Sequence, residues 1–155
     1  MMSGMKQLSG LALLAVSAIG VSVGSASQKP PVGTRGLTEI VTRFEAVGCQ
    51  IVEASFDKGR WELEGYRNDL AFELAVDRDT ERLVSIRQDD VDPPPPAGAK
   101  PLSQILNEVT RSGCTQIVGA ELKRGQWKVE AYRELSRREL QVDAISGAIL
   151  TEQAD

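Results

Sequence analysis

The sequence predicts an α+β protein made of two tandem units, each with one helix packed on a four-stranded antiparallel meander. The first reason is a repeat, because the stretch GRWELEGYR at residues 59–67 returns as GQWKVEAYR at residues 125–133. Both copies alternate apolar and polar side chains with a period of two, which is typical of a strand with one buried face. The second reason is an amphipathic helical stripe that precedes the strands in each unit.

The first unit is expected at residues 37–90. Its helix should span residues 37–47 and end at Gly48, as helices often end at a glycine; the apolar stripe consists of Leu37, Ile40, Val41, Phe44 and Val47. Four strands should follow, with turns at residues 57–59, 68–69 and 78–81 and a short last strand around residues 83–87. Val52, Ala54 and Phe56 are expected to share the core face of the first strand.

The second unit, residues 102–155, repeats these features. Its helical stripe is Leu102, Ile105, Leu106 and Val109, Gly113 ends the helix, and the first strand carries Val118, Ala120 and Leu122. The offset between the units is 65 residues from Cys49 to Cys114 and 66 residues from Ile51 to Ile117. Such a repeat indicates duplication. Residues 91–101, with four consecutive prolines, are expected to be a Pro-rich linker.

The N-terminus predicts export. Residues 1–27 have the pattern of a signal peptide, with Lys6 before an apolar core and a small-residue cleavage site at residues 25–27. An uncleaved N-terminal anchor is the alternative. Residues 28–36 contain two prolines and two glycines and should form an extended lead-in. The mature protein is therefore expected in the bacterial periplasm or outside the cell, with no membrane association after cleavage.

The composition argues against several function classes. The net charge of −4 and the pI of about 5.0 disfavour nucleic acid and anionic membranes as partners. The chain has no histidine, which removes the usual general base and the usual metal ligand. It also lacks a Cys-x-x-Cys pair and a Gly-rich phosphate loop. We therefore expect no catalytic residue, no metal site, no cofactor and no enzyme activity.

The polar face of the predicted sheet is the candidate binding surface. If each helix covers the other face of its strands, this face stays uncovered, and tyrosines among charges are typical of contact surfaces. Its predicted members are Glu62, Glu64, Tyr66, Glu73, Lys128, Glu130, Tyr132 and Glu139. The alternative is that this is simply the solvated side of an antiparallel sheet. Trp61 and Trp127, on the opposite face, are expected in the core.

The repeat resembles the PepSY family of small exported domains. The likeness in the first unit depends on Gly48, Gly59, Trp61, Glu64, Glu73, Val76, Asp77 and Thr80. In the second unit it depends on Gly113, Gly125, Trp127, Glu130, Glu139, Val142, Asp143, Ser146 and Gly147. The first unit departs from the pattern at Glu81, where a turn glycine is expected.

The resemblance implies a helix on an antiparallel sheet, similar to the two-unit β-lactamase-inhibitor protein, and a role in binding or inhibiting peptidases or other envelope proteins. We therefore expect an exported binding module whose partner is an envelope protein or peptide. A periplasmic carrier of a small ligand or cation, using the carboxylates of the polar face, is the alternative. A purely structural envelope protein is a third possibility.

Cys49 and Cys114 occupy matching positions and could form a disulfide in an oxidising compartment. Two units side by side in the same strand order would put their first strands about 19 Å apart, whereas a disulfide needs Cα atoms within about 7 Å. A bridge therefore requires the first strands or helix ends to meet near a pseudo-two-fold axis. The alternative is that each cysteine is a small buried apolar residue.

Overall fold

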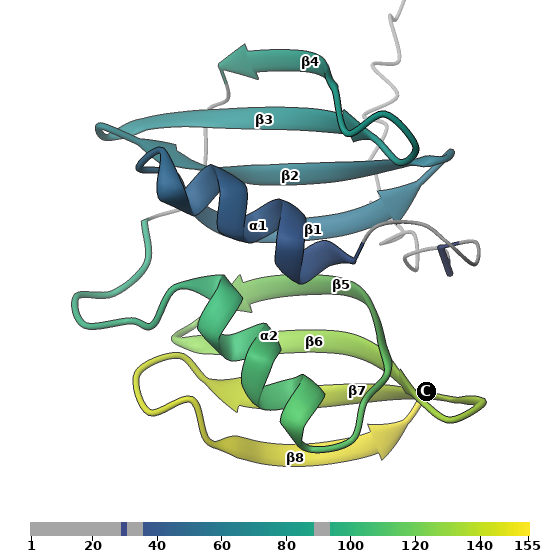
Figure 1. Cartoon of the computed structure of the whole chain (residues 1–155). Helices are drawn as coiled ribbons and strands as arrows, with labels where there is room; N and C mark the ends of the chain where they lie inside the picture. Colours follow the sequence, from purple (N-terminus) through teal and green to yellow (C-terminus); the bar gives the residue numbers. More distant parts are fainter. Residues whose placement is uncertain (1–28, 31–35, 89–93) are drawn as a thin grey trace, which may run out of the picture.

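The computed structural model describes residues 29–30, 36–88 and 94–155 (Figure 1). The predicted signal peptide lies outside these residues. The elements of the N-terminal half are α1 (Leu37–Ala46), β1 (Gln50–Asp57), β2 (Arg60–Arg67), β3 (Leu70–Asp77) and β4 (Leu83–Gln88). Those of the C-terminal half are α2 (Leu102–Arg111), β5 (Gln116–Lys123), β6 (Gln126–Arg133), β7 (Ser136–Asp143) and β8 (Ile149–Ala154).

All eight strands belong to one antiparallel sheet, in the order β4-β3-β2-β1-β5-β6-β7-β8 (Figure 1). β1 joins β5 through the pairs Glu53 with Glu121, Ala54 with Ala120, and Ser55 with Gly119. The predicted fold class, two tandem units each with its own helix and meander, is therefore wrong: the molecule is mainly β, one continuous sheet with two helices. The physical reason is that β1 and β5 would otherwise be open edges with unpaired backbone groups, and pairing them satisfies both.

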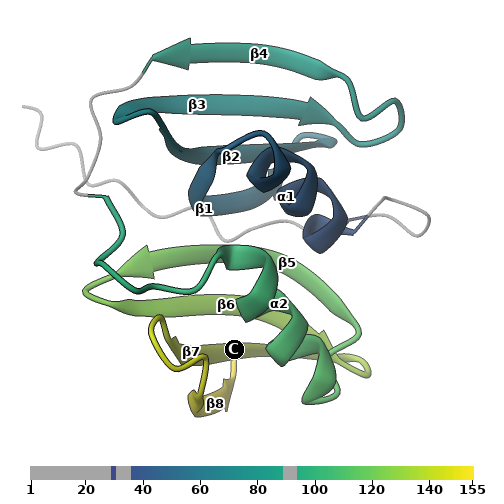
Figure 2. The same cartoon turned by 60° about the vertical axis from the view of Figure 1, so that its left-hand side comes forward.

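Both helices lie on the same face of this sheet (Figures 1 and 2). One continuous apolar cluster lies between the helices and the sheet, and it contains residues of both halves. Trp61 and Trp127 are each only 1% exposed within it, which confirms that both are core residues. The sheet face without helices is therefore the polar face.

Both helices end at a glycine with a positive φ, as the sequence predicts for Gly48 and Gly113. Gly48 has a φ of +88° and Gly113 a φ of +106°. After α1, the Gly48 N–H donates to the Glu45 carbonyl (3.0 Å) and the Cys49 N–H to the Phe44 carbonyl (3.1 Å). This is the Schellman pattern, which favours glycine because a side chain at positive φ is strained.

A β-bulge changes the predicted face of one residue in each first strand. The register shifts between Ile51 and Glu53 in β1 and between Ile117 and Gly119 in β5. Ile51 and Ile117 therefore join the core cluster, whereas Val52 and Val118 are buried outside it. The prediction that Val52 and Val118 share the core face is wrong, because a bulge inserts one residue and breaks the period of two.

The turn after β3 keeps its form although it lacks the expected glycine. Glu81 has a φ of +56°, and the matching Gly147 has a φ of +76°. The Glu81 N–H donates to the Asp77 carbonyl (3.0 Å), as the Gly147 N–H does to the Asp143 carbonyl (2.9 Å). The departure at Glu81 therefore leaves the backbone of the turn unchanged, at the expense of a non-glycine residue in a left-handed conformation.

Candidate functional site

The predicted binding residues lie on β2, β3, β6 and β7 of the single sheet. Their chain neighbours Trp61, Leu63 and Leu74 belong to the core cluster, so strand alternation directs the predicted residues to the polar face. Seven of the eight are half-buried; the exception is Tyr66, which is only 9% exposed. The expectation that both tyrosine rings lie on an open surface is therefore wrong for Tyr66.

The sheet brings the predicted carboxylates together in pairs. Glu64 lies directly opposite Glu73 on β2 and β3, and Glu130 lies directly opposite Glu139 on β6 and β7. Side chains at directly opposite positions have Cβ atoms about 5 Å apart, and like charges there are destabilising. Four of the predicted residues therefore form two opposed acidic pairs.

Two further glutamates, which the sequence reasoning missed, extend the first pair into a row. Glu53 of β1 lies opposite Glu64, and Glu121 of β5 lies opposite Glu53. The acidic row, defined as Glu73, Glu64, Glu53 and Glu121, therefore crosses four neighbouring strands at one level. The alternation in β1 already places Glu53 away from the core, but its approach to Glu121 depends on the pairing of β1 with β5.

Cations flank the acidic row at its two ends. Arg87 of β4 lies opposite Glu73 and its Nε donates to Glu73 Oε2 (3.0 Å). At the other end Lys128 lies opposite Glu121, and Lys123 Nζ is 2.5 Å from Glu121 Oε1. The centre of the row, Glu64 and Glu53, has glutamates on both sides. Four carboxylates therefore follow one another across the middle of the sheet, with cations at both ends.

The second acidic pair is more nearly balanced. Arg137 forms ion pairs with Glu130 and with Asp155, whose Oδ2 is 2.7 Å from Arg137 Nε. Lys128 Nζ lies 3.8 Å from Glu130 Oε1, and Gln141 Nε2 donates to Glu139 Oε1 (3.3 Å). The β6–β7 part of the polar face is therefore mixed in charge, in contrast to the acidic row.

Two residues of the N-terminal lead-in, Lys29 and Pro30, lie against part of this face. Lys29 Nζ lies 4.3 Å from the centroid of the Tyr132 ring, within the range of a cation–π contact. Gln116 Nε2 donates to the Pro30 carbonyl (3.0 Å), and Pro30 is buried. Tyr132 therefore already contacts a cation of the same chain, and Gln116, which lies opposite it, is bonded to the adjacent Pro30.

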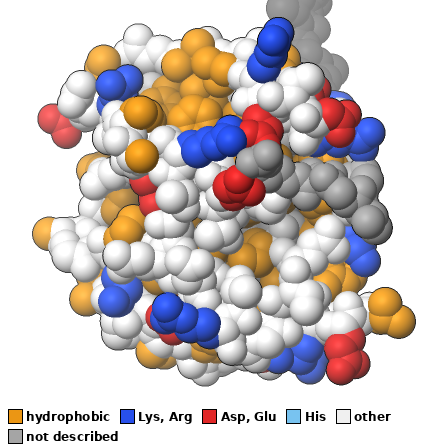
Figure 3. All heavy atoms as spheres, viewed as in Figure 1, with side chains coloured by type: hydrophobic (Ala, Val, Ile, Leu, Met, Phe, Trp, Pro, Cys, Tyr) orange, Lys and Arg blue, Asp and Glu red, His pale blue; other side chains and the backbone are white. Residues whose placement is uncertain are grey.

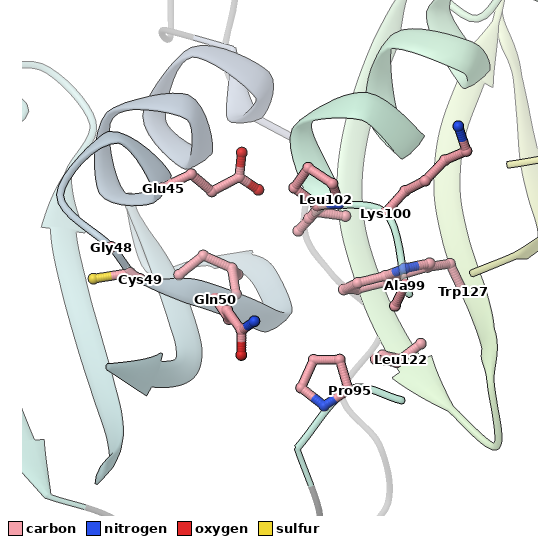
Figure 4. Close-up of a pocket in the computed structure, with 12 residues that line it drawn as sticks. Glu45, Gly48, Cys49, Gln50, Pro95, Ala99, Lys100, Leu102, Leu122 and Trp127 are labelled. Atoms are coloured by element: carbon pink, nitrogen blue, oxygen red, sulfur yellow. The ribbon is translucent and has the colours of Figure 1, made fainter. Parts of the chain in front are cut away.

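A pocket of about 400 Å³ lies between the two halves on the helix side, lined by Glu45, Gly48, Cys49, Gln50, Ile51, Pro95, Ala99, Lys100, Pro101, Leu102, Leu122 and Trp127 (Figure 4). Glu45 is engaged as a cap, because Ser103 of α2 donates its N–H to Glu45 Oε1 (3.0 Å) and its hydroxyl to Glu45 Oε2. The Cys49 sulfur and the Lys100 ammonium point away from the pocket (Figure 4). Its polar groups thus join α1 to α2 and offer no reactive centre.

The cysteines are not bridged in the structure. Both are free and buried. β1 and β5 do meet as neighbours, but they run antiparallel, so Cys49 and Cys114 lie at opposite ends of two eight-residue strands. Cys49 precedes Ala54 by five residues, and Cys114 precedes the opposite residue Ala120 by six. At about 3.3 Å per residue, these eleven residues (5 + 6) separate the cysteines by roughly 36 Å, which excludes a bridge in this arrangement. Burial raises the pKa of the Cys49 thiol, so it stays neutral.

The described part of the chain contains neither a cluster of metal ligands nor a helix suited to crossing a membrane. Residues 29–30, 36–88 and 94–155 contain no group of three or more Cys, Asp or Glu side chains arranged to hold a metal ion. α1 and α2 have ten residues each, and neither has the length and apolar character that a membrane crossing requires.

No protein-family model and no curated protein sequence matches the chain. Two crystal structures are similar to it. A candidate lipoprotein from Clostridium difficile 630 is 12% identical with a TM-score of 0.45, over 84% of this chain and 97% of that chain. A DUF2874 family protein from Bacteroides uniformis is 14% identical with a TM-score of 0.28, over 76% of this chain and 86% of that chain. At these scores neither likeness carries an argument about function.

Proposed function

We propose that the protein is an exported, non-catalytic binding module that holds a cationic envelope protein or peptide, such as a peptidase, through the polar face of its sheet. The observation that carries the proposal is the acidic row of Glu73, Glu64, Glu53 and Glu121 at directly opposite positions on four strands. The proposal agrees with the binding role that the PepSY resemblance implies.

The acidic row favours a cationic partner for a physical reason. Three consecutive glutamate pairs place carboxylates at directly opposite positions of neighbouring strands, where like charges are unfavourable. Lysine and arginine side chains of a partner are complementary in charge to such a row of carboxylates, and this complementarity also accelerates the encounter. Binding is therefore strongest at low ionic strength and weakens as salt screens the charges.

Export is part of the proposal because the predicted signal peptide, residues 1–27, precedes the folded residues. The partner would then be met in the periplasm or outside the cell. Inhibition would follow if the bound surface of the partner contains its active site, which requires no catalytic group on this chain.

A capture experiment tests the proposal. The protein is immobilised and exposed to a bacterial envelope extract, and retained proteins are identified at low and high salt. A triple variant, Glu53→Gln, Glu64→Gln and Glu121→Gln, should lose the partner. The matched control is Glu39→Gln, Glu108→Gln and Glu134→Gln, which makes the same change of net charge away from the polar face and should retain it.

Two results would contradict the proposal. Equal loss in both triple variants would show that net charge alone attracts the partner. Micromolar binding of Ca²⁺ in a calorimetric titration, with no protein captured, would instead support the carrier alternative, which the absence of a metal-holding group among the described residues disfavours.

A further inference from the structure

Among the described residues, the sheet ends in two edge strands, β4 and β8. They differ on the helix side, at the position opposite a core leucine of the neighbouring strand. β8 has Glu152 there, in an ion pair with Arg133, whereas β4 has Ile86. A charge that points inward at an edge hinders pairing with another strand. Glu152 therefore protects β8, and β4 has no such protection at the matching position.

Apolar surface surrounds the unprotected edge. All six residues of β4 are exposed, including Leu83, Val84 and Ile86. Val76, directly opposite Leu83, belongs to a pocket of about 260 Å³ that is lined by Ile40, Arg43, Phe44, Val47, Val76 and Glu81. Figure 3 shows hydrophobic side chains gathered over this part of the molecule. Because an edge strand has unpaired backbone N–H and C=O groups, β4 combines open hydrogen-bonding groups with an apolar flank.

Three pairings can join the edges of two copies, and the side chains favour one of them. In the matching antiparallel register, β8 with β8 would set Glu152 opposite Glu152, where like charges are destabilising. β4 with β8 would set Ile86 opposite the ion-paired Glu152 and would leave an open edge at each end, so the assembly would not close. β4 with β4 would set Ile86 opposite Ile86 on the helix side and Arg87 opposite Ser85 on the polar face, with no like charges opposed.

We propose that two copies of this chain form a dimer by antiparallel pairing of their β4 strands, with the two-fold axis at Ile86. Such a contact uses the same surface on both copies and therefore closes at two. It also repeats a join that the molecule already contains, because β1 and β5, the matching first strands of the two halves, pair antiparallel and leave both helices on one face (Figure 1). The pairing leaves both polar faces accessible, so the inference goes beyond the proposed function and does not depend on it.

Sedimentation equilibrium of the exported protein, with its processed N-terminus established by mass spectrometry, measures the dimer. A micromolar dissociation constant is expected, because an interface made by one strand of each copy is small. Ile86→Glu should raise this constant at least about tenfold, since it exchanges an apolar pair at the axis for opposed carboxylates. Ser85→Glu makes the same charge change on the other face of β4 and should not raise it, because the new carboxylate would lie opposite Arg87. Both residues are exposed, and circular dichroism should show that both variants remain folded.

Two further experiments test the axis itself. Ile86→Glu and Ile86→Lys should each be monomeric where the unmodified chain is a dimer, whereas their equimolar mixture should form dimers, because position 86 lies opposite position 86. Ile86→Cys should form an intermolecular disulfide on oxidation, since directly opposite Cα atoms are about 4.5–5.5 Å apart, within the range of a disulfide. The control is Thr151→Cys, at an exposed position of β8, which should not cross-link. The native cysteines are buried and should not interfere.

Four outcomes would overturn the inference. These are a monomer at every concentration, equal loss of the dimer in Ile86→Glu and Ser85→Glu, no dimer in the mixture, and cross-linking through Thr151→Cys but not Ile86→Cys. A monomer whose capture of an envelope protein is lost in Ile86→Glu would assign the edge to a strand of that protein. A monomer whose Ile86 amide is protected from hydrogen exchange would assign it to a segment of the same chain. Absence of the dimer leaves the proposed function standing, because the glutamine triple variant tests that function on the polar face.

Discussion

The two halves of the sheet have the same elements in the same order, yet their outer edges differ. On the helix side of β8, Glu152 lies opposite Leu140 and pairs with Arg133, through Nε (2.8 Å) and Nη2 (2.9 Å). The matching position on β4, opposite Leu74, is Ile86, which is 63% exposed. Figure 3 shows hydrophobic side chains gathered over this N-terminal part of the molecule.

The difference between Glu152 and Ile86 shows how one side chain decides whether an edge strand presents a charged or an apolar surface. Arg133, the last residue of β6, also donates through Nη1 to the Ser112 carbonyl (2.6 Å). In the C-terminal half this one arginine therefore joins the edge strand β8 to β6 and to the end of α2. In the N-terminal half, Leu83, Val84 and Ile86 leave an apolar edge strand. An apolar, unpaired edge is prone to associate with other strands.

The largest expected effect compares the two core tryptophans. Trp61→Ala and Trp127→Ala should each lower the free energy of unfolding by about 3–5 kcal/mol. Trp61 also makes an edge contact with Phe56, with ring centroids 5.1 Å apart, and such a contact contributes about 1 kcal/mol. Trp127 Nε1, by contrast, is buried without a hydrogen-bond partner among the described residues. In urea unfolding followed by circular dichroism, Trp61→Ala should therefore lower the free energy of unfolding more than Trp127→Ala does. The reverse order would contradict this prediction.

The next effect compares Gly65 with Ala131, which lie opposite the two β-bulges. A Cβ at Gly65 would lie 2.3 Å from the Gln50 carbonyl oxygen, whereas Ala131 is accommodated with no exposed surface. Gly65→Ala should cost about 1–3 kcal/mol through this backbone clash, and Ala131→Gly less than about 1 kcal/mol. Thermal unfolding of both variants checks the prediction, and equal losses would show that the N-terminal bulge can shift to make room.

A smaller effect concerns pH. The hydrogen bond from Arg133 lowers the pKa of Glu152. Because the folded-state pKa lies below the unfolded value of about 4.3, the stabilisation is present above that value and is lost as the pH falls through the folded-state pKa. Glu152→Gln should therefore destabilise the protein by at most about 1 kcal/mol at pH 7 and have no effect near pH 2. Urea titrations at both pH values measure this, and a loss that persists at pH 2 would point to packing instead.

The smallest effect on stability is expected at the apolar edge. Ile86→Glu gives β4 the residue that β8 has at the matching position, and it should change the free energy of unfolding by less than about 0.5 kcal/mol, because Ile86 is exposed. It should lower self-association at high concentration, measured by light scattering. Ser85→Glu, with the same charge change on the other face of β4, is the control. If both variants suppress association equally, net charge and not the apolar edge is responsible.

The amino-acid sequence by itself determined the local structure of this protein. The helices, the strands, their glycine ends and the two core tryptophans follow from periods of 3.6 and 2 and from the backbone freedom of glycine, all of which act between near neighbours in the chain. The same periods assigned Glu64, Glu73, Glu130 and Glu139 to one polar face and placed them in opposed pairs.

Only the tertiary structure decided how the two halves meet. The pairing of β1 with β5 joins two strands that are far apart in the sequence. Every strand has the same backbone donors and acceptors, so the pattern of side chains does not reveal which strand it will pair with. That pairing turned two units into one sheet, placed Glu53 beside Glu121, and kept Cys49 far from Cys114. The bulges and the contact of Lys29 with Tyr132 likewise depend on packing between segments. The alternation of side chains within a single strand does not predict such packing.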